Sequence, residues 1–344
     1  MGNYYIPAKY LFNKIVDVEI LTAPFITSKT IELGSKYSPD FVCTPFKYTL
    51  GTMIEALDNG ANVLVQFGGG CRYGYYSELQ EQILKDLGYK FELHNLITSG
   101  KTNVKRIYKI MKRIDKKFSI IKGLYYLYIT KNMVKYMDKI DDYIRRNIGF
   151  EVTKNSFLNL NKEMLNSFSK VNNSISLYIL YKKYFKKFKK IKINKPKNCL
   201  KVGVIGELYT LMEPFSNYYL EKELASFNIE IKRFTNVNYL LFKHQKTINK
   251  ALNKSKKYMK YQLSADASSN VFWTKYLCEK KYDGIIHIKS SFCTPEIGVM
   301  PIIDKVASNY NVPIIYFSFD ANTSEVGIKT RLEAFYDMIE MRRK

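Results

Sequence analysis

The sequence predicts an α/β protein made of two α/β units, with mainly parallel sheets and a helical insert between them. Short apolar runs that end in glycine alternate with segments of helical spacing in residues 1–97 and 198–344. Residues 98–197 are instead rich in charged and aromatic residues and contain no proline before Pro196. Alternation of strand and helix is typical of a parallel sheet that is covered on both faces. With 344 residues, the chain is long enough for roughly two domains of ordinary size.

The N-terminal unit, residues 1–97, contains a predicted helix, strand and helix. The apolar run 62–67 leads into three glycines, which indicates a buried strand followed by a tight loop. Apolar residues recur at helical spacing before this run, at Leu50, Met53, Ile54 and Leu57, and after it, at Tyr76, Leu79, Ile83, Leu84 and Leu87. Gly88 is a suitable C-terminal cap for the second helix.

The insert, residues 98–197, is predicted to be helical. Its last part, 182–197, holds nine lysines in sixteen residues, with aromatic and aliphatic residues between them. We interpret this part as an amphipathic helix whose lysines face water and which leads into a linker. The alternative is a surface that docks an acidic partner, nucleic acid or a phosphate-bearing ligand.

The C-terminal unit, residues 198–344, repeats the alternation of strand and helix. The apolar run 201–206 ends in glycine, and helical spacing follows through Leu220 and Leu224. Further strands are predicted at 229–234, 284–288 and 312–319, with helices between them and a last helix over 328–341.

The composition predicts a soluble cytoplasmic protein without a membrane partner. No apolar run approaches the roughly 20 residues of a transmembrane helix, and the N-terminus lacks the features of a secretory signal. The formal net charge of +24 would usually point to nucleic acid or an anionic surface. Asparagine, isoleucine and tyrosine are abundant as well, however, which AT-rich coding favours, and no RNA-binding or zinc-finger signature occurs. We therefore expect a solvated basic surface and no nucleic acid partner.

Three of the five cysteines, Cys43, Cys71 and Cys293, share one local setting. Each follows an apolar run that predicts a buried strand and precedes a segment that predicts a helix. At the carboxyl ends of parallel strands, the N-terminus of the next helix favours a thiolate. Proline two residues after Cys43 and after Cys293 suits the first turn of a helix. Because Pro301 also follows Cys293, we expect a short turn there and a regular helix only from Pro301.

The spacing of these cysteines predicts a metal or iron–sulfur site between the two units, with plain burial as the alternative. No Cys-x-x-Cys pair occurs, which disfavours ferredoxin-type runs, thioredoxin chemistry and zinc ribbons. Three thiolates on a four-iron cluster would leave one iron open. Burial accounts for Cys199 and Cys278, and the isolated His94, His244 and His287 are interpreted as structural. No phosphate loop and no dinucleotide fingerprint occur, so energy input would have to come from another protein.

Six motifs stand out: residues 1–7 (MGNYYIP), 32–39 (ELGSKYSP), 43–47 (CTPFK), 68–76 (GGGCRYGYY), 292–296 (FCTPE) and 330–335 (TRLEAF). Together they resemble the 2-hydroxyacyl-CoA dehydratase family, whose type member is the D-component of 2-hydroxyglutaryl-CoA dehydratase. The closest branch is that of the activase-related proteins. The resemblance covers residues 1–97 and 199–341.

The resemblance implies two Rossmann-like domains and one oxygen-sensitive [4Fe-4S] cluster held by Cys43, Cys71 and Cys293. It also implies a separate ATP-dependent activator that supplies low-potential electrons, and it allows a homodimer or a heterodimer. In the better-known dehydratases, one electron converts a thioester substrate into a ketyl radical and water is lost. For this chain, the resemblance implies either such a lyase reaction on a small acyl-CoA-like substrate or an iron–sulfur reductase.

Two features depart from the family pattern. Family members begin with a strand before the MGNYY loop, so we expect the first strand of the N-terminal unit to be missing or the start to lie upstream. The chain has five cysteines, which cannot supply the six ligands of two cubanes. One cluster per chain is therefore expected.

Polar residues at predicted strand ends are candidates for the remaining chemistry. Glu207 follows the strand 201–206, and Asp320 and Arg331 follow the last strand. Each is expected to line a substrate pocket or to tune the cluster, with a helix cap or surface pair as the alternative. Two other functions stay open: a non-catalytic binding protein that docks through 182–197, and a zinc site on the same three sulfurs.

Overall fold

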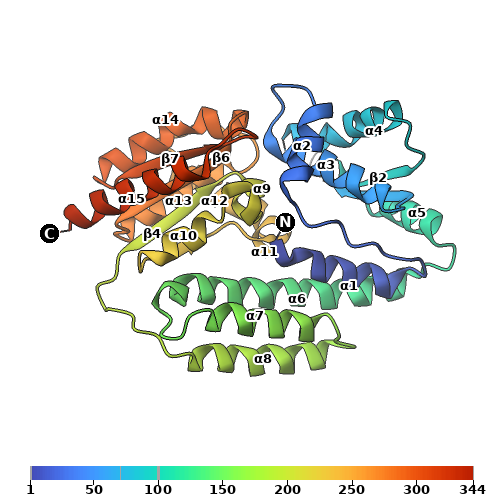
Figure 1. Cartoon of the computed structure of the whole chain (residues 1–344), viewed down its shortest axis with the longest axis horizontal. Helices are drawn as coiled ribbons and strands as arrows, with labels where there is room; N and C mark the ends of the chain where they lie inside the picture. The colour runs from blue at the N-terminus through green and yellow to red at the C-terminus, as the bar shows by residue number, and fades with distance from the viewer. Residues whose placement is uncertain (1, 70, 99–100, 344) are drawn as a thin grey trace.

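The computed structural model describes residues 2–69, 71–98 and 101–343, which form two sheets with their helices above a layer of long helices (Figure 1). The N-terminal sheet has the order β1-β2-β3, in which β1 and β2 are parallel and β3 is antiparallel. Its strands are β1 Val63–Phe67, β2 Glu92–Thr98 and β3 Lys101–Thr102, and the neighbouring helices are α1 Tyr5–Ile15, α2 Ser28–Tyr37, α3 Thr44–Asp58 and α4 Tyr76–Asp86.

Most predicted elements of this unit are confirmed, and two expectations are wrong. The strand 62–67 and both flanking helices are present, and Gly88 ends α4 with a φ of 87°. No strand precedes Cys43, because Phe41 lies in a turn with 78% of its surface exposed. The MGNYY segment is not a loop, since a 3-10 helix, Gly2–Tyr4, leads directly into α1.

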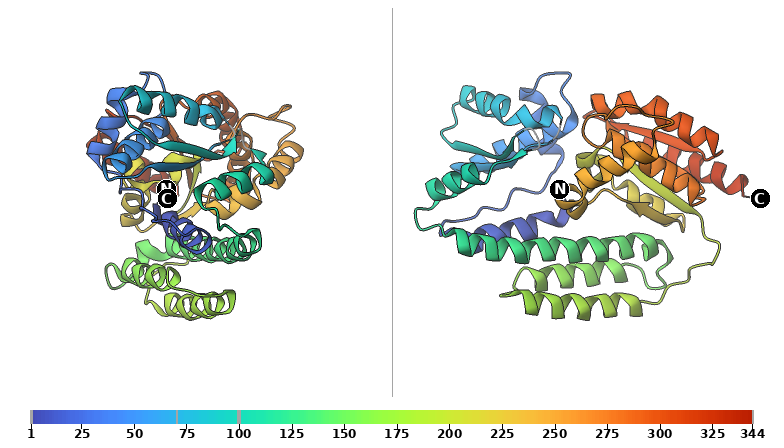
Figure 2. Two further views of the ribbon diagram at one scale, coloured as in Figure 1. Left: turned by 90° about the vertical axis from the view of Figure 1, so that its right-hand side faces the viewer. Right: turned by 180° about the vertical axis from the view of Figure 1, so that it is seen from behind.

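The start of the insert differs from the expectation, because β2 runs to Thr98 and β3, Lys101–Thr102, belongs to the N-terminal sheet. The rest of the insert is mainly helical, and its helices lie below or beside the sheets (Figures 1 and 2). They are α5 Val104–Ile114, α6 Ile120–Asn147, α7 Ser156–Phe168 and α8 Ser174–Lys190, with a 3-10 turn Ile148–Phe150. α1 packs along α6, and a shared core joins α1, α6, α7 and α8. α8 is amphipathic, as predicted: Tyr181, Tyr184 and Phe188 are buried, and most lysines of 182–197 are exposed.

The C-terminal sheet is fully parallel, with the order β5-β4-β6-β7. Its strands are β4 Lys201–Gly206, β5 Glu230–Arg233, β6 Gly284–Ser290 and β7 Ile314–Phe319. The helices are α9 Leu208–Met212, α10 Leu220–Ser226, α11 Val237–Phe242, α12 His244–Lys254, α13 Ala267–Glu279, α14 Thr294–Asn309 and α15 Glu325–Met341, with a 3-10 turn Pro214–Asn217. One apolar core joins α10 and α15 to one face of the sheet, and a second joins α13 and α14 to the other.

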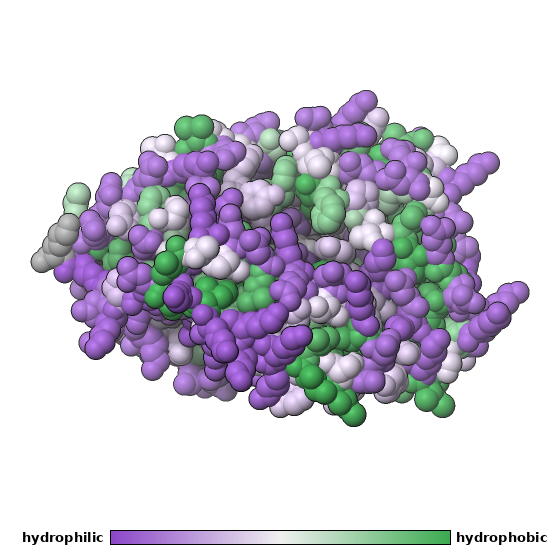
Figure 3. All heavy atoms as spheres, turned by 60° about the horizontal axis from the view of Figure 1, so that its bottom comes forward, coloured by the Kyte–Doolittle hydropathy of each residue, from purple (hydrophilic) through white to green (hydrophobic). Residues whose placement is uncertain are grey.

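This arrangement confirms the α/β class with mainly parallel sheets. It corrects one detail, because α14 begins directly after Cys293 and continues through Pro301 without a separate turn. Among the described residues, no helix is both long and apolar enough to cross a membrane. Figure 3 shows a mainly hydrophilic face with scattered hydrophobic patches. Exposed apolar residues on the insert include Ile121, Leu124 and Ile175.

Candidate functional site

Buried polar side chains gather at the carboxyl edge of the C-terminal sheet. They are Thr44, Ser268, Ser269, Asn270, His287, Lys289, Ser290 and Glu296. Polar residues are rarely buried without a partner or a purpose, and ligands of parallel sheets bind at this edge. The edge is therefore the place to look for chemistry.

Cys43 is the N-cap of α3, and its loop is fastened to this edge. The Thr44 backbone N–H donates to Ser290 Oγ at 2.8 Å, and Thr44 Oγ1 donates to the Phe319 carbonyl at 2.9 Å. The Cys43 sulfur lies 2.6 Å from the Tyr76 hydroxyl of α4. Burial raises the pKa of the Cys43 thiol to about 11, although the Tyr76 hydrogen bond opposes the shift. The thiol is thus desolvated and hydrogen-bonded at once.

Cys71 follows β1 and precedes the 3-10 turn Arg72–Tyr75. Only glycine fits at position 68, because a Cβ there would lie 2.3 Å from the Ile97 carbonyl oxygen. The Tyr73 backbone N–H donates to the Cys71 sulfur at 3.4 Å. The Arg72 guanidinium donates to Thr294 Oγ1 at 3.1 Å, which joins this loop to the Cys293 loop. Gly70, the last of the three glycines, lies outside the described residues.

Cys293 is the N-cap of α14 and follows β6 after two turn residues. The ring of Phe292 meets that of Phe41 edge-on at 5.7 Å, so the Cys293 loop also touches the Cys43 loop. Burial raises the pKa of the Cys293 thiol far above its ordinary value, and Glu207 and Glu296 add to the shift. All three predicted cysteines therefore lie on loops that contact one another.

The three thiols also interact electrostatically. Cys71 raises the pKa of Cys43, and Cys43 raises that of Cys293. Glu207 raises the pKa of each of the three thiols. Since such interactions fade with distance, the three cysteines, which are far apart in the sequence, lie in one region of the fold with Glu207 nearby.

Glu207 directly follows Gly206, where β4 passes very close to the backbone of β6. Gly206 has a φ of 136°, and a Cβ there would lie 1.8 Å from the Ile288 carbonyl oxygen. The Glu207 carboxylate caps α9 by accepting hydrogen bonds from the backbone N–H groups of Tyr209 and Thr210, at 2.8 and 2.9 Å. Burial outweighs these bonds and raises the pKa of Glu207 to about 7. The helix-cap alternative is thus correct for Glu207, and it does not exclude a role at the thiols.

The other two candidates lie differently. Asp320 accepts a hydrogen bond from Ser291 Oγ at 3.0 Å, next to the Cys293 loop, and also organises the turn after β7. Arg331 is exposed, donates to the Tyr316 carbonyl at 2.6 Å and covers the ring of Phe317. No contact in the described part of the chain brings Arg331 to the thiols, so its pocket-lining role is not supported.

Three buried side chains near Cys293, those of His287, Glu296 and Asn270, form a hydrogen-bonded group that the sequence predicted only in part. His287 Nε2 lies 2.7 Å from Glu296 Oε2, which also accepts a hydrogen bond from the Asn270 amide at 2.9 Å. His287 is in the core, as predicted, but within the described structure its Nδ1 atom has no partner. The Cys-Thr-Pro-Glu motif was the only sequence signal for Glu296. Asn270 on α13 had no signal at all.

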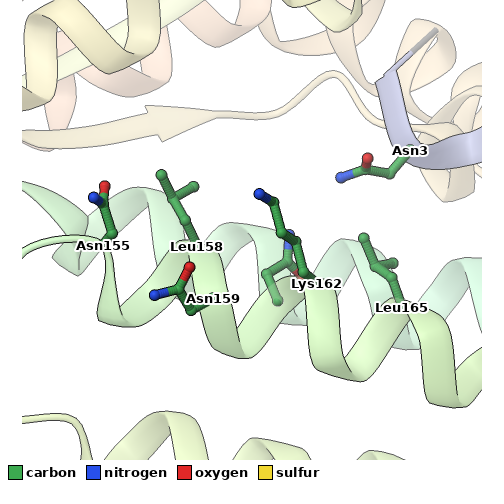
Figure 4. A pocket seen from close by; sticks show the side chains of 7 residues that line it. Asn3, Asn155, Leu158, Asn159, Lys162 and Leu165 are labelled. Atoms are coloured by element: carbon green, nitrogen blue, oxygen red, sulfur yellow. The ribbon is translucent and has the colours of Figure 1, made fainter.

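The remaining cysteines and histidines are largely structural. Cys199 and Cys278 are buried, as predicted. His94 lies 3.1 Å from Glu92, and the His244 side chain lies outside the described residues. Within the described ranges, no three His, Cys, Asp or Glu side chains form a group that could hold a single metal ion. A pocket between the N-terminal residues and α7 contains none of the cysteines (Figure 4).

The family comparison matches the part of the chain that includes Cys293. Residues 248–339 match the family model for 2-hydroxyglutaryl-CoA dehydratase, D-component. The matched segment contains His287, Lys289, Cys293, Glu296 and Asp320, whereas Cys43 and Cys71 lie outside it. The match supports the dehydratase family that the motifs resemble. No curated protein matches the chain.

Proposed function

We propose that this chain is an iron–sulfur protein of the 2-hydroxyacyl-CoA dehydratase type, in which Cys43, Cys71 and Cys293 hold one [4Fe-4S] cluster. The observation that carries the proposal is the convergence of these three cysteines from both sheets onto one polar edge, with the family match around the third. When bound, the cluster would supply low-potential electron transfer to a small acyl-CoA-like substrate. The activase-related branch remains the closest resemblance.

The donor set suits a cluster better than a single ion. Each of the three sulfurs precedes a helical turn, where backbone N–H groups favour thiolates. In a cubane, each thiolate binds a different iron atom, so the sulfurs do not need to surround one point. A zinc ion would require all three sulfurs around one point, and metal analysis separates this alternative from iron. The raised thiol pKa values mean that a metal must displace protons when it binds.

The residues around the thiols have separate roles in this proposal. Tyr76 orients the Cys43 sulfur, and Arg72 and Thr44 hold the loops of the two units together. Glu207 is the candidate to hold or release a proton, because loss of water from a 2-hydroxyacyl substrate requires a proton for the departing hydroxyl group. Asp320 would orient the Cys293 loop through Ser291.

The partners follow from the same proposal. As the family resemblance implies, a separate ATP-dependent activator would deliver the electrons, and the substrate would be a CoA thioester. We further propose a cytoplasmic location, three domains at 1–97, 98–197 and 198–344, and a homodimer or heterodimer. The alternative of a binding protein that docks nucleic acid or an acidic partner rests on the exposed lysines of α8 alone.

Anaerobic iron and sulfide analysis tests the proposal. After reconstitution, we expect about four irons per chain, as a single cubane requires. Replacement of Cys43, Cys71 or Cys293 by Ala should remove most of this iron. Cys199→Ala and Cys278→Ala are matched controls, because these cysteines are buried away from the site, and they should retain it. Zinc in place of iron, or full iron in the three site variants, would overturn the proposal.

A further inference from the structure

Lys289 is a largely buried lysine for which the described residues provide no partner. Lys289 is 5% exposed and is the last residue but one of β6. Since it follows His287 by two residues, the two side chains lie on the same face of the strand. In the part of the chain that the structure describes, its ammonium group makes no hydrogen bond and no ion pair. Removal of a charge from water is costly unless the charge is paired. The Lys289 ammonium group is not one of the fully buried polar atoms that lack a partner, so it keeps contact with solvent. A lysine in such a largely buried position, without a protein partner among the described residues, favours negative charge beside it.

The three cysteine thiols, once deprotonated, would provide the negative charge beside Lys289. Lys289 stands four residues before Cys293, and Cys293 and Glu296 are the two groups that act on it electrostatically. The other groups that act on the thiols are acidic: Glu207 on all three, and Asp266 on Cys71. Arg72, the other cation nearby, is exposed and bonded to Thr294. Lys289 is thus a partly desolvated positive charge at an acidic site.

Reduction would add to the negative charge of this site. Three thiolates bring three negative charges, and one electron taken from an external reductant adds another, while the reductant is oxidised by one electron. A fixed positive charge in a poorly solvated position stabilises the reduced form more than the oxidised form. Acidic neighbours act in the opposite direction.

We propose that Lys289 compensates the charge of the cluster-bearing site and raises its reduction potential, as a positioning and tuning residue that does not touch substrate. The inference rests on the proposed function, because it requires a cluster on Cys43, Cys71 and Cys293. It goes beyond that function by assigning the control of the potential to one side chain outside the ligand set.

Redox titration of the reconstituted protein, followed by the spectrum of the cluster under argon, tests this role. Lys289→Gln should keep its iron but reduce with an equilibrium constant at least tenfold lower, which corresponds to about 59 mV for one electron. Lys289→Arg, which retains the charge, should stay close to the wild-type protein. Lys305→Gln removes the same charge from an exposed position of α14 and should leave the potential unchanged.

The outcomes separate the two proposals. A wild-type chain that binds no iron overturns the proposed function, and the role of Lys289 with it. A loaded Lys289→Gln variant with the wild-type potential overturns the role of Lys289 alone. If Lys289→Gln does not fold by circular dichroism, Lys289→Met, which keeps the volume of the side chain, takes its place with the same expected shift.

Discussion

Two regions of this molecule bury charged side chains, and they differ in whether those charges have protein partners. Where the insert meets the C-terminal unit, charges are paired: Glu221 accepts hydrogen bonds from Arg145 at 2.9 Å and from Arg233 at 3.0 Å. Nearby, Asp138 accepts hydrogen bonds from the Tyr4 hydroxyl and from the Asn238 backbone N–H. At the cysteine edge, by contrast, Lys289 has no partner among the described residues.

The difference separates structure from function. A paired buried charge is satisfied by the fold itself, and its removal leaves the partner uncompensated. A largely buried charge without a protein partner is satisfied by solvent or by a group that binds, and proteins tolerate the cost of such positions mainly at functional sites. The interface of the insert therefore holds the molecule together, whereas the cysteine edge has the features expected of the proposed cluster site.

The largest expected effect comes from breaking the paired region. Arg145→Ala leaves Glu221 with a buried carboxylate that has lost one of its two cations. We expect the free energy of unfolding to fall by about 3–5 kcal/mol, as for other broken buried pairs. Denaturant unfolding followed by circular dichroism measures it.

The matched control for Arg145 is a surface pair. Lys187 contacts Glu163 at 2.8 Å, but both side chains are well exposed. Lys187→Ala should leave the free energy of unfolding unchanged, because exposed pairs are screened by water. If Arg145→Ala is as mild as this control, the paired interface is not what stabilises the docking of the insert.

A smaller effect concerns pH. Burial raises the pKa of Asp138 to about 6, so the folded state binds its proton more tightly than the unfolded state does. The contribution of Asp138 is therefore most favourable below about pH 4 and is lost as pH rises through about 6, by an amount of about 3 kcal/mol. Asp138→Asn should flatten this part of the stability profile between pH 4 and 7. An unchanged slope in the variant would show that Asp138 is not the group responsible.

The smallest effect has the opposite sign. Lys289→Met should stabilise the cluster-free protein by about 1 kcal/mol, because it removes an unpaired charge and fills the same space. Chemical denaturation of the apo-protein measures this, with Lys305→Met on the exposed face of α14 as the control. A loss of stability in Lys289→Met would mean that the lysine is satisfied by the fold, and the contrast between the two regions would fail.

Local patterns predicted the elements well where a run was long. The run 62–67 and the four C-terminal strands formed as expected, because their apolar residues are buried on the sheets. Phe41 and Val42 did not form a strand, since two apolar residues do not specify one and Phe41 packs on Phe292 instead. The sequence also could not tell where Arg331 points, because a position after a strand does not fix the direction of a side chain along the following helix.

What the sequence determined by itself is the set of segments and the setting of each cysteine: a glycine-rich or proline-marked loop before a helix. Those features depend on neighbours in the chain. Only the tertiary structure decided that the loops of Cys43, Cys71 and Cys293 contact one another, that Glu207 lies near them, and that Arg145 is paired while Lys289 has no partner among the described residues. These depend on contacts such as Thr44 with Ser290, which lie 246 residues apart, and no local pattern carries information about a partner so distant.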